Sequence, residues 1–169
     1  MAVRYAVATG NWSAVETWDG GTTLPTEGDD VYANGYTVSI DQDITVTKIS
    51  TEVCPTTSVG GGQFYVIKNG DFYLIGNIVA GLSGCLDYGN GVSSTLSRLY
   101  LIGNVYGGTL SNAYGIYLSS TIYNNAPVKQ PIIIGNLYGG SGSNTHAIVS
   151  RTDRQYAIIL TGNIYAGTG

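Results

Sequence analysis

The phrase Gly103-Asn104-Val105-Tyr106-Gly107-Gly108 decides the fold, because three close variants of it occur in the last hundred residues of the chain. The variants are Gly76-Asn77-Ile78-Val79-Ala80-Gly81, Gly135-Asn136-Leu137-Tyr138-Gly139-Gly140 and Gly162-Asn163-Ile164-Tyr165-Ala166-Gly167. Their first glycines are 27, 32 and 27 residues apart. A period of this size is typical of solenoids, in which each repeat buries its apolar face on its neighbours.

Each copy follows a short apolar run whose residue types favour strands. The runs are Tyr73-Leu74-Ile75, Tyr100-Leu101-Ile102, Ile132-Ile133-Ile134 and Ile158-Ile159-Leu160-Thr161. Glycine is abundant, at 25 of 169 residues, and no segment shows a helical period. We therefore predict an all-β, right-handed, parallel β-helix-like solenoid with coils that start near residues 73, 100, 132 and 158. The alternative geometry is an antiparallel meander, which would not bring identical repeat positions into register.

Superposition of the copies predicts which positions stack inside. One aliphatic column contains Leu74, Leu101, Ile133 and Leu160, and a second, four residues later, contains Ile78, Val105, Leu137 and Ile164. An even spacing places both columns on the inner face of a continuous strand. The outer face then carries Ile75, Ile102, Ile134 and Thr161, the asparagines Asn77, Asn104, Asn136 and Asn163, and finally Val79, Tyr106, Tyr138 and Tyr165. If Gly-Asn is a left-handed corner, the alternation resets there and the asparagines form an inward ladder instead.

A second strand and a variable loop complete each predicted coil. The strand candidates are Cys85-Leu86-Asp87-Tyr88, Tyr114-Gly115-Ile116-Tyr117-Leu118 and Ala147-Ile148-Val149. The loops expected to return the chain are 90–97, 119–130 and 151–155. Variation in length at one corner is compatible with stacking.

The composition favours burial of the outer surface by other chains. Only 11% of residues are charged, whereas 43% are apolar and 14 are tyrosine. Since monomer surfaces usually carry more charge and interfaces are rich in tyrosine, we predict contacts between subunits. The alternative is a soluble surface of Ser, Thr, Asn and Tyr. Residues 1–71 hold nine acidic and three basic residues, and residues 72–169 hold two acidic and four basic ones. No basic stripe indicates a nucleic-acid partner.

The sequence lacks the signals of export and of membrane insertion. The apolar stretch that follows Met1 is too short for a signal peptide, and no apolar run is close to the length needed to span a membrane. Cys54 and Cys85 are the only cysteines, and we expect two reduced, packed thiols rather than a disulfide.

Residues 1–71 are predicted to form an amino-terminal cap and attachment region, distinct from the repeat solenoid of residues 72–169. Two tryptophans, Trp12 and Trp18, suit a cap over the first coil, because an open end exposes strand edges and core. Pro25, Asp29 and Asp30 complete the set of attachment and cap candidates. Alternating residues between Tyr36 and Ile49 indicate short strands.

The order Gly10-Asn11-Trp12, Thr17-Trp18, Pro25-Thr26, Asp29-Asp30-Val31 and Val38-Ser39-Ile40-Asp41 resembles the start of structural proteins of tailed bacteriophages. The Gly-Asn phrases resemble repeats in the same group. The resemblance implies a β-helical body, commonly trimeric, whose amino-terminal region joins a capsid or tail protein. It implies a virion component made in the host cytoplasm: a head decoration or head fibre, or alternatively a tail fibre or tailspike that recognises cell-surface glycan. Bacterial β-helical adhesins share such tryptophan-rich caps.

No residue set in the sequence indicates catalysis, and we predict a protein that is not an enzyme and has no cofactor or metal. Asp87 and Asp153 lie in different parts of different coils, so they do not form the acid pair of a glycosidase. The acidic group Asp29, Asp30, Asp41 and Asp43 matches no calcium loop and is typical of turns. His146 lacks a nucleophile nearby, and Gly60-Gly61-Gly62 lacks the strand-to-helix context of a phosphate loop.

Aligned Tyr106, Tyr138 and Tyr165 have two interpretations. Exposed aromatic rings can bind the apolar faces of sugars, or they can form a ladder between coils or subunits. We favour the ladder. The repeat also continues to Gly167-Thr168-Gly169, which is expected for a fragment of a longer fibre or for a last coil that a partner covers.

Overall fold

The computed structural model describes residues 2–88, 98–118, 130–150 and 157–168. Regular structure in this part of the chain is almost entirely strand, with a single 3-10 turn, η1 (Val15–Thr17). The prediction of an all-β chain is therefore confirmed. The variable loops predicted at 90–97, 119–130 and 151–155 lie outside the described residues except for Gln130.

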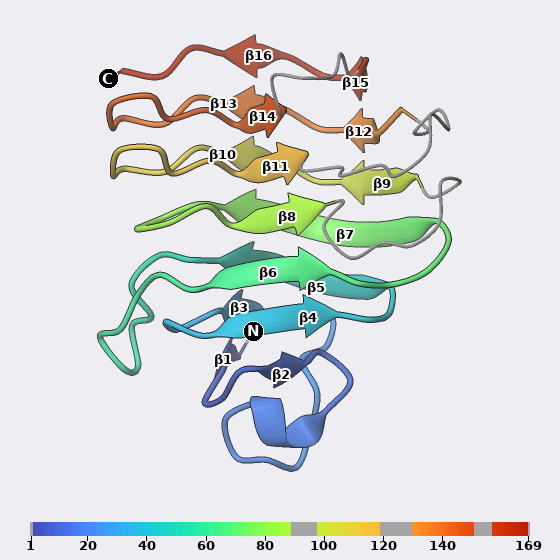
Figure 1. Ribbon diagram of the computed structural model, residues 1–169, viewed down its shortest axis with the longest axis vertical. Helices are drawn as coiled ribbons and strands as arrows, with labels where there is room; N and C mark the ends of the chain where they lie inside the picture. The colour runs from blue at the N-terminus through green and yellow to red at the C-terminus, as the bar shows by residue number, and fades with distance from the viewer. Residues whose placement is uncertain (1, 89–97, 119–129, 151–156, 169) are drawn as a thin grey trace.

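The strands form two sheets that face each other, and within each sheet the strands are stacked along the long axis of the molecule (Figure 1). The ten described strands of the large sheet are β1 (Val3–Tyr5), β3 (Asp30–Tyr32), β5 (Ile44–Ser50), β7 (Phe72–Val79), β9 (Leu99–Ile102), β10 (Val105–Tyr106), β12 (Ile132–Ile134), β13 (Leu137–Tyr138), β15 (Ile159–Thr161) and β16 (Ile164–Tyr165). The six described strands of the small sheet are β2 (Gly10–Asn11), β4 (Thr37–Ile40), β6 (Gln63–Val66), β8 (Leu86–Tyr88), β11 (Ile116–Leu118) and β14 (Ile148–Ser150).

Every ladder between these strands is parallel, which excludes the antiparallel meander. In the large sheet, Leu74 pairs with Leu101, and Ile133 pairs with both Leu101 and Leu160. The second aliphatic column is also in register from Ile78 to Ile164. Equal positions of successive repeats therefore lie above one another, which is the arrangement of a parallel, solenoid-like fold.

The core lies between the two sheets. Leu74, Leu101 and Ile133 of the large sheet are at most 1% exposed. They belong to one buried cluster with a column from the small sheet that contains Val38, Phe64, Leu86 and Ile116. The predicted second strands correspond to β8, β11 and β14, and these supply the opposite wall of the core. The apolar residues of each coil are thus buried on the same residues of its neighbours.

The Gly-Asn step shows why glycine recurs at one position of every copy. Gly76, Gly103, Gly135 and Gly162 have φ angles between 146° and 155°, which L side chains rarely adopt. A Cβ on Gly103 would lie 2.0 Å from the carbonyl oxygen of Gly76, and one on Gly135 would lie 2.0 Å from that of Gly103. The strand is continuous through this step in β7, but it is divided there in the three later copies. Both aliphatic columns nevertheless face the core.

The first end of the stack is closed by side chains near the start of the chain. Trp12 and Trp18 are at most 1% exposed, and their rings meet edge to face with centroids 4.9 Å apart. The indole Nε1 of Trp18 donates a hydrogen bond of 2.9 Å to the carbonyl oxygen of Trp12. η1 and its flanking loops lie at this end of the molecule, beyond β2 (Figure 1). The large sheet continues from β5 to β7 across the boundary predicted at residue 71, with a shift of register between Thr45 and Lys48.

A substitution of Gly103 by alanine tests the close approach of successive coils. The control is Gly70→Ala, because Gly70 also has a positive φ, of 84°, but has nothing within 4 Å of a Cβ. We expect Gly70→Ala to cost about 1–2 kcal/mol from backbone strain alone. Gly103→Ala adds overpacking against a backbone oxygen that cannot rotate away, and we expect a loss of about 3 kcal/mol or more. Urea unfolding measures both values, and equal losses in the two variants would contradict the stacking.

Candidate functional site

The outer face of the large sheet carries an exposed column of isoleucines. Ile75, Ile102 and Ile134 are paired in register and are 44%, 48% and 47% exposed. We call these three residues the isoleucine column. Among the described residues, each exposed large apolar side chain that belongs to a strand lies in the large sheet. Contiguous apolar surface of this kind marks interaction sites in soluble proteins.

Stacked tyrosines lie on both sides of the isoleucine column. Tyr106, Tyr138 and Tyr165 form one tyrosine ladder, with centroid distances of 4.7 and 4.8 Å and interplanar angles of 4° and 6°. Tyr73 and Tyr100 form a second tyrosine ladder, at 4.5 Å and 6°. This second pair was not predicted from the sequence, although alignment of the apolar runs places Tyr73 and Tyr100 at equal positions. Because each ring lies flat against the next, the faces between neighbours are covered.

An asparagine ladder separates the isoleucine column from the longer tyrosine ladder. The side-chain Oδ1 of Asn77 accepts a hydrogen bond of 2.9 Å from the backbone N–H of Asn104. The same bond recurs from Asn136 N–H to Asn104 Oδ1 at 2.8 Å, and from Asn163 N–H to Asn136 Oδ1 at 3.0 Å. The side-chain amides thus bond to the next coil, as the asparagine-ladder alternative predicted. However, Asn77, Asn104 and Asn136 are half-buried and do not belong to the core.

Other side-chain oxygens also bridge successive coils, and these bridges were not predicted from the sequence. Asp43 accepts from the N–H of Tyr73 at 2.8 Å, Asp71 from that of Arg98 at 2.9 Å, and Thr51 Oγ1 from that of Gly81 at 3.0 Å. These residues are not equivalent in the repeat, so no aligned column reveals them. Their only signal is a side-chain acceptor near the end of a strand.

The described residues from 98 onward, which we call the upper coils, carry very little charge. Of the described residues from 98 onward, Arg98 alone is an Asp, Glu, Lys or Arg. Most native sheets place charged side chains at exposed positions, which opposes unwanted association. In these coils the outer face of the large sheet therefore lacks the usual barrier to contact with another chain.

The attachment candidates near the start of the chain have different environments. Trp12, Trp18 and Pro25 are buried, so their side chains close the core rather than meet solvent. Asp29 accepts hydrogen bonds from the backbone N–H of Thr26, at 3.0 Å, and of Ala2, at 3.4 Å, which fixes the turn before β3. Asp30 begins β3, and one of its carboxylate oxygens is buried without a hydrogen-bond partner among the described residues.

The other acidic residues considered in the sequence have different partners. Asp41 bonds the backbone N–H of Ser13 at 3.1 Å, and Asp43 forms an ion pair of 3.0 Å with Lys68. No group of three or more potential metal ligands occurs within the described residues. Asp87 lies in β8 and is 2% exposed, while its former candidate partner Asp153 lies outside the described residues.

The two cysteines are both fully buried and are not joined to each other. The thiol of Cys85 donates to the carbonyl oxygen of Ile49 over 3.6 Å. Burial raises the pKa of the Cys85 thiol, which suppresses the reactive thiolate. Neither cysteine has the exposed, electropositive environment of a catalytic nucleophile.

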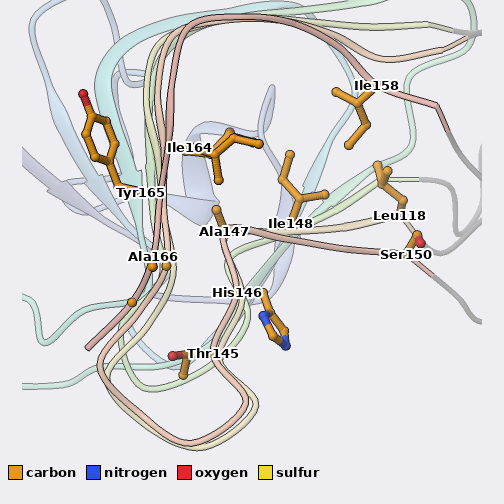
Figure 2. Close-up of a pocket in the computed structure, with 13 residues that line it drawn as sticks. Leu118, Thr145, His146, Ala147, Ile148, Ser150, Ile158, Ile164, Tyr165 and Ala166 are labelled. Carbon is orange, nitrogen blue, oxygen red and sulfur yellow. The ribbon is translucent and has the colours of Figure 1, made fainter. Parts of the chain in front are cut away.

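A hollow of about 400 Å³ opens where the core reaches the last described coil. Figure 2 shows Ile148, Ile158 and Ile164 directed into it, and Tyr165 directed to the opposite side of β16 from Ile164. Ile164 lies in the last described coil and is 74% exposed. His146 is exposed, and Figure 2 shows its imidazole directed away from these isoleucines. The lining is mainly aliphatic, with Thr145, His146 and Ser150 among its polar members, and the described lining residues contain no acid–base pair.

Comparisons with known proteins give no family for this chain: no protein-family description matches it, and neither does a curated protein or a solved structure. In the described part of the chain, no helix has the length and apolar character needed to cross a membrane.

The asparagine ladder gives a residue-specific prediction. In Asn104→Ala the N–H of Asn136 loses its acceptor, so we expect a loss of about 1–3 kcal/mol and hydrogen exchange at Asn136 that is about tenfold to a hundredfold faster. Asn104→Asp retains an acceptor oxygen and serves as the control. Hydrogen exchange measured by NMR reads the amide of Asn136 directly. Unchanged exchange in Asn104→Ala would show that the bond does not hold the coils together.

Proposed function

We propose that this protein is a non-enzymatic structural component of a tailed-bacteriophage virion, either a head decoration or a fibre-type protein, that forms a rigid projection. The observation that carries the proposal is the in-register stack of the Gly-Asn repeats, in which each coil is bonded to the next by backbone and side chain. Such a stack is an extended and stiff body. The resemblance of the amino-terminal sequence to phage structural proteins supplies the biological setting.

The finer architecture that we propose is a closed, right-handed parallel β-helix with an amino-terminal β cap. The two facing parallel sheets, the shared core and the buried tryptophans support it. In this proposal residues 1–71 form the cap and attachment region, and residues 72–169 form the shaft.

Attachment is proposed through the amino-terminal region to a capsid or tail protein. Residues 1–71 hold nine of the eleven acidic residues, and Glu16 and Glu27 are exposed there. A basic surface on the partner would complement this end. Since Trp12 and Trp18 are buried, they act by shaping the end of the stack and not by direct contact.

The shaft is proposed to be a homotrimer. The low charge of the upper coils and their exposed apolar side chains support association of copies side by side. A projection made of several parallel solenoids also resists bending better than a single one.

The alternative, a tail fibre or tailspike that binds cell-surface glycan, receives less support. Sugar rings pack on the faces of aromatic rings, but the faces between Tyr106, Tyr138 and Tyr165 are covered by the neighbouring tyrosine. Packing between coils therefore accounts for these tyrosines better than glycan binding does.

Mass spectrometry of purified particles tests the proposed virion role. The particles come from the phage or prophage whose genome encodes this chain, purified by density gradient and washed at high salt. We expect peptides of the chain at a fixed ratio to the major capsid protein, with no loss on washing. Absence of the chain from infectious particles would contradict the proposal, and a proportion that falls with each wash would indicate a contaminant.

A further inference from the structure

The face of the chain on which copies associate can be assigned. We propose that the outer face of the large sheet is the contact surface between copies, with the isoleucine column of Ile75, Ile102 and Ile134 at its centre. This inference rests on the proposed side-by-side assembly and names the surface that carries it. The occupant is another copy of the same chain, aligned in parallel.

The distribution of exposed apolar side chains selects this face. The large sheet carries Tyr73, Ile75, Ile102, Ile134, Ile159 and Tyr165, each between 44% and 48% exposed. The small sheet differs, because its outer column places Asp87 between Tyr65 and Tyr117, and Asp87 is almost fully buried. Burial of the isoleucine column against another chain removes apolar surface from water, whereas the small sheet offers no comparable exposed strand residues within the described part.

The isoleucine column repeats once per coil, and this repeat favours a second copy of the chain as the binding partner. One isoleucine is presented by each of three successive coils, at the spacing of parallel strands. A globular partner would match this repeat at one point only. A second solenoid of the same rise matches it in every coil, so each isoleucine meets its own counterpart or that of the adjacent coil.

The flanks of the column fit an arrangement around a common axis. The column is one residue wide, with the ladder of Tyr73 and Tyr100 on one side and the asparagine ladder on the other. Three copies can therefore bring their isoleucine columns to a threefold axis parallel to the stack. The tyrosine ladder of one copy then lies beside the asparagine ladder of the next, and phenol and amide groups are natural hydrogen-bond partners.

Charge is sparse beside the column: Lys48, which pairs with Asn77 near Ile75, is in an ion pair of 3.0 Å with Glu52. No Asp, Glu, Lys or Arg lies among the described residues that flank the column in the coils of Ile102 and Ile134, apart from Arg98 at the start of its coil. Arg98 contacts Tyr100 from 5.8 Å, with its charge over the ring. Association of this face therefore requires little desolvation of charge.

The first test compares Ile102→Lys with Leu110→Lys by light scattering. The two side chains lie in the same coil and are 48% and 50% exposed, so neither substitution removes a core residue, but Leu110 lies in a turn outside the sheet. We expect wild type and Leu110→Lys to have three chain masses and Ile102→Lys to have one, because like charges would meet at the axis. A trimeric Ile102→Lys would overturn the assignment of the face while leaving the proposed trimer intact. A monomeric wild type would overturn both, while particle composition still tests the virion role separately.

A second test uses a cross-link and does not depend on disruption. Ile102→Cys places a thiol on the column, and mild oxidation should give a disulfide-linked dimer on a non-reducing gel, since identical residues meet across the axis. Cys54 and Cys85 are fully buried, so the background is low, and Leu110→Cys is the control. Cross-linking of Ile102→Cys at least tenfold above Leu110→Cys is expected. Equal cross-linking in both variants would overturn the proposal.

Discussion

At every Gly-Asn step the backbone of one coil lies against that of the coil below at a distance that excludes any Cβ, and the rest of the structure depends on this contact. The clearance from a Cβ on Gly103 to the oxygen of Gly76 would be 2.0 Å. The parallel ladder is interrupted there, and the side chain of the asparagine below accepts the N–H that would otherwise lack a partner. Glycine permits the close approach of the two backbones, and the asparagine side chain accepts the unpaired backbone N–H, so the two residues act together. This contact therefore fixes the rise per coil, and the fixed rise sets the register of the core residues.

This register explains the two surfaces of the large sheet. On the inner side, equal positions stack as aliphatic columns such as Leu74, Leu101 and Ile133, which are buried because each covers the next. On the outer side, the same rule places isoleucine on isoleucine and tyrosine on tyrosine. A repeat that optimises the core therefore also produces a periodic outer face. Such a face is suited to a partner of the same period, and this links the packing of the coil to the assembly that we propose.

Much of the fold could be predicted from the sequence because the repeat is explicit. The interior columns, the outward tyrosines and the second strands follow from aligned copies, and the parallel ladder from their identity in register. The role of the asparagines remained open between two geometries, since the backbone of a Gly-Asn step cannot be read from residue types alone. The bridges from Thr51, Asp43 and Asp71 were missed because they occur once each and depend on where a strand ends. Trp12 and Trp18 were predicted as cap residues from their position near the chain end, and their burial makes them packing residues.

Side-chain amides of one coil hold the backbone of the next. Scalar coupling across hydrogen bonds, measured by NMR on ¹⁵N,¹³C-labelled protein, tests it most directly. We expect a coupling between the amide nitrogen of Asn136 and the side-chain Cγ of Asn104, and an equivalent coupling between Asn104 and Asn77. A coupling of Asn136 to a backbone carbonyl instead, or an Asn136 amide that exchanges at the rate of an unprotected chain, would contradict the stacked register on which the whole account depends.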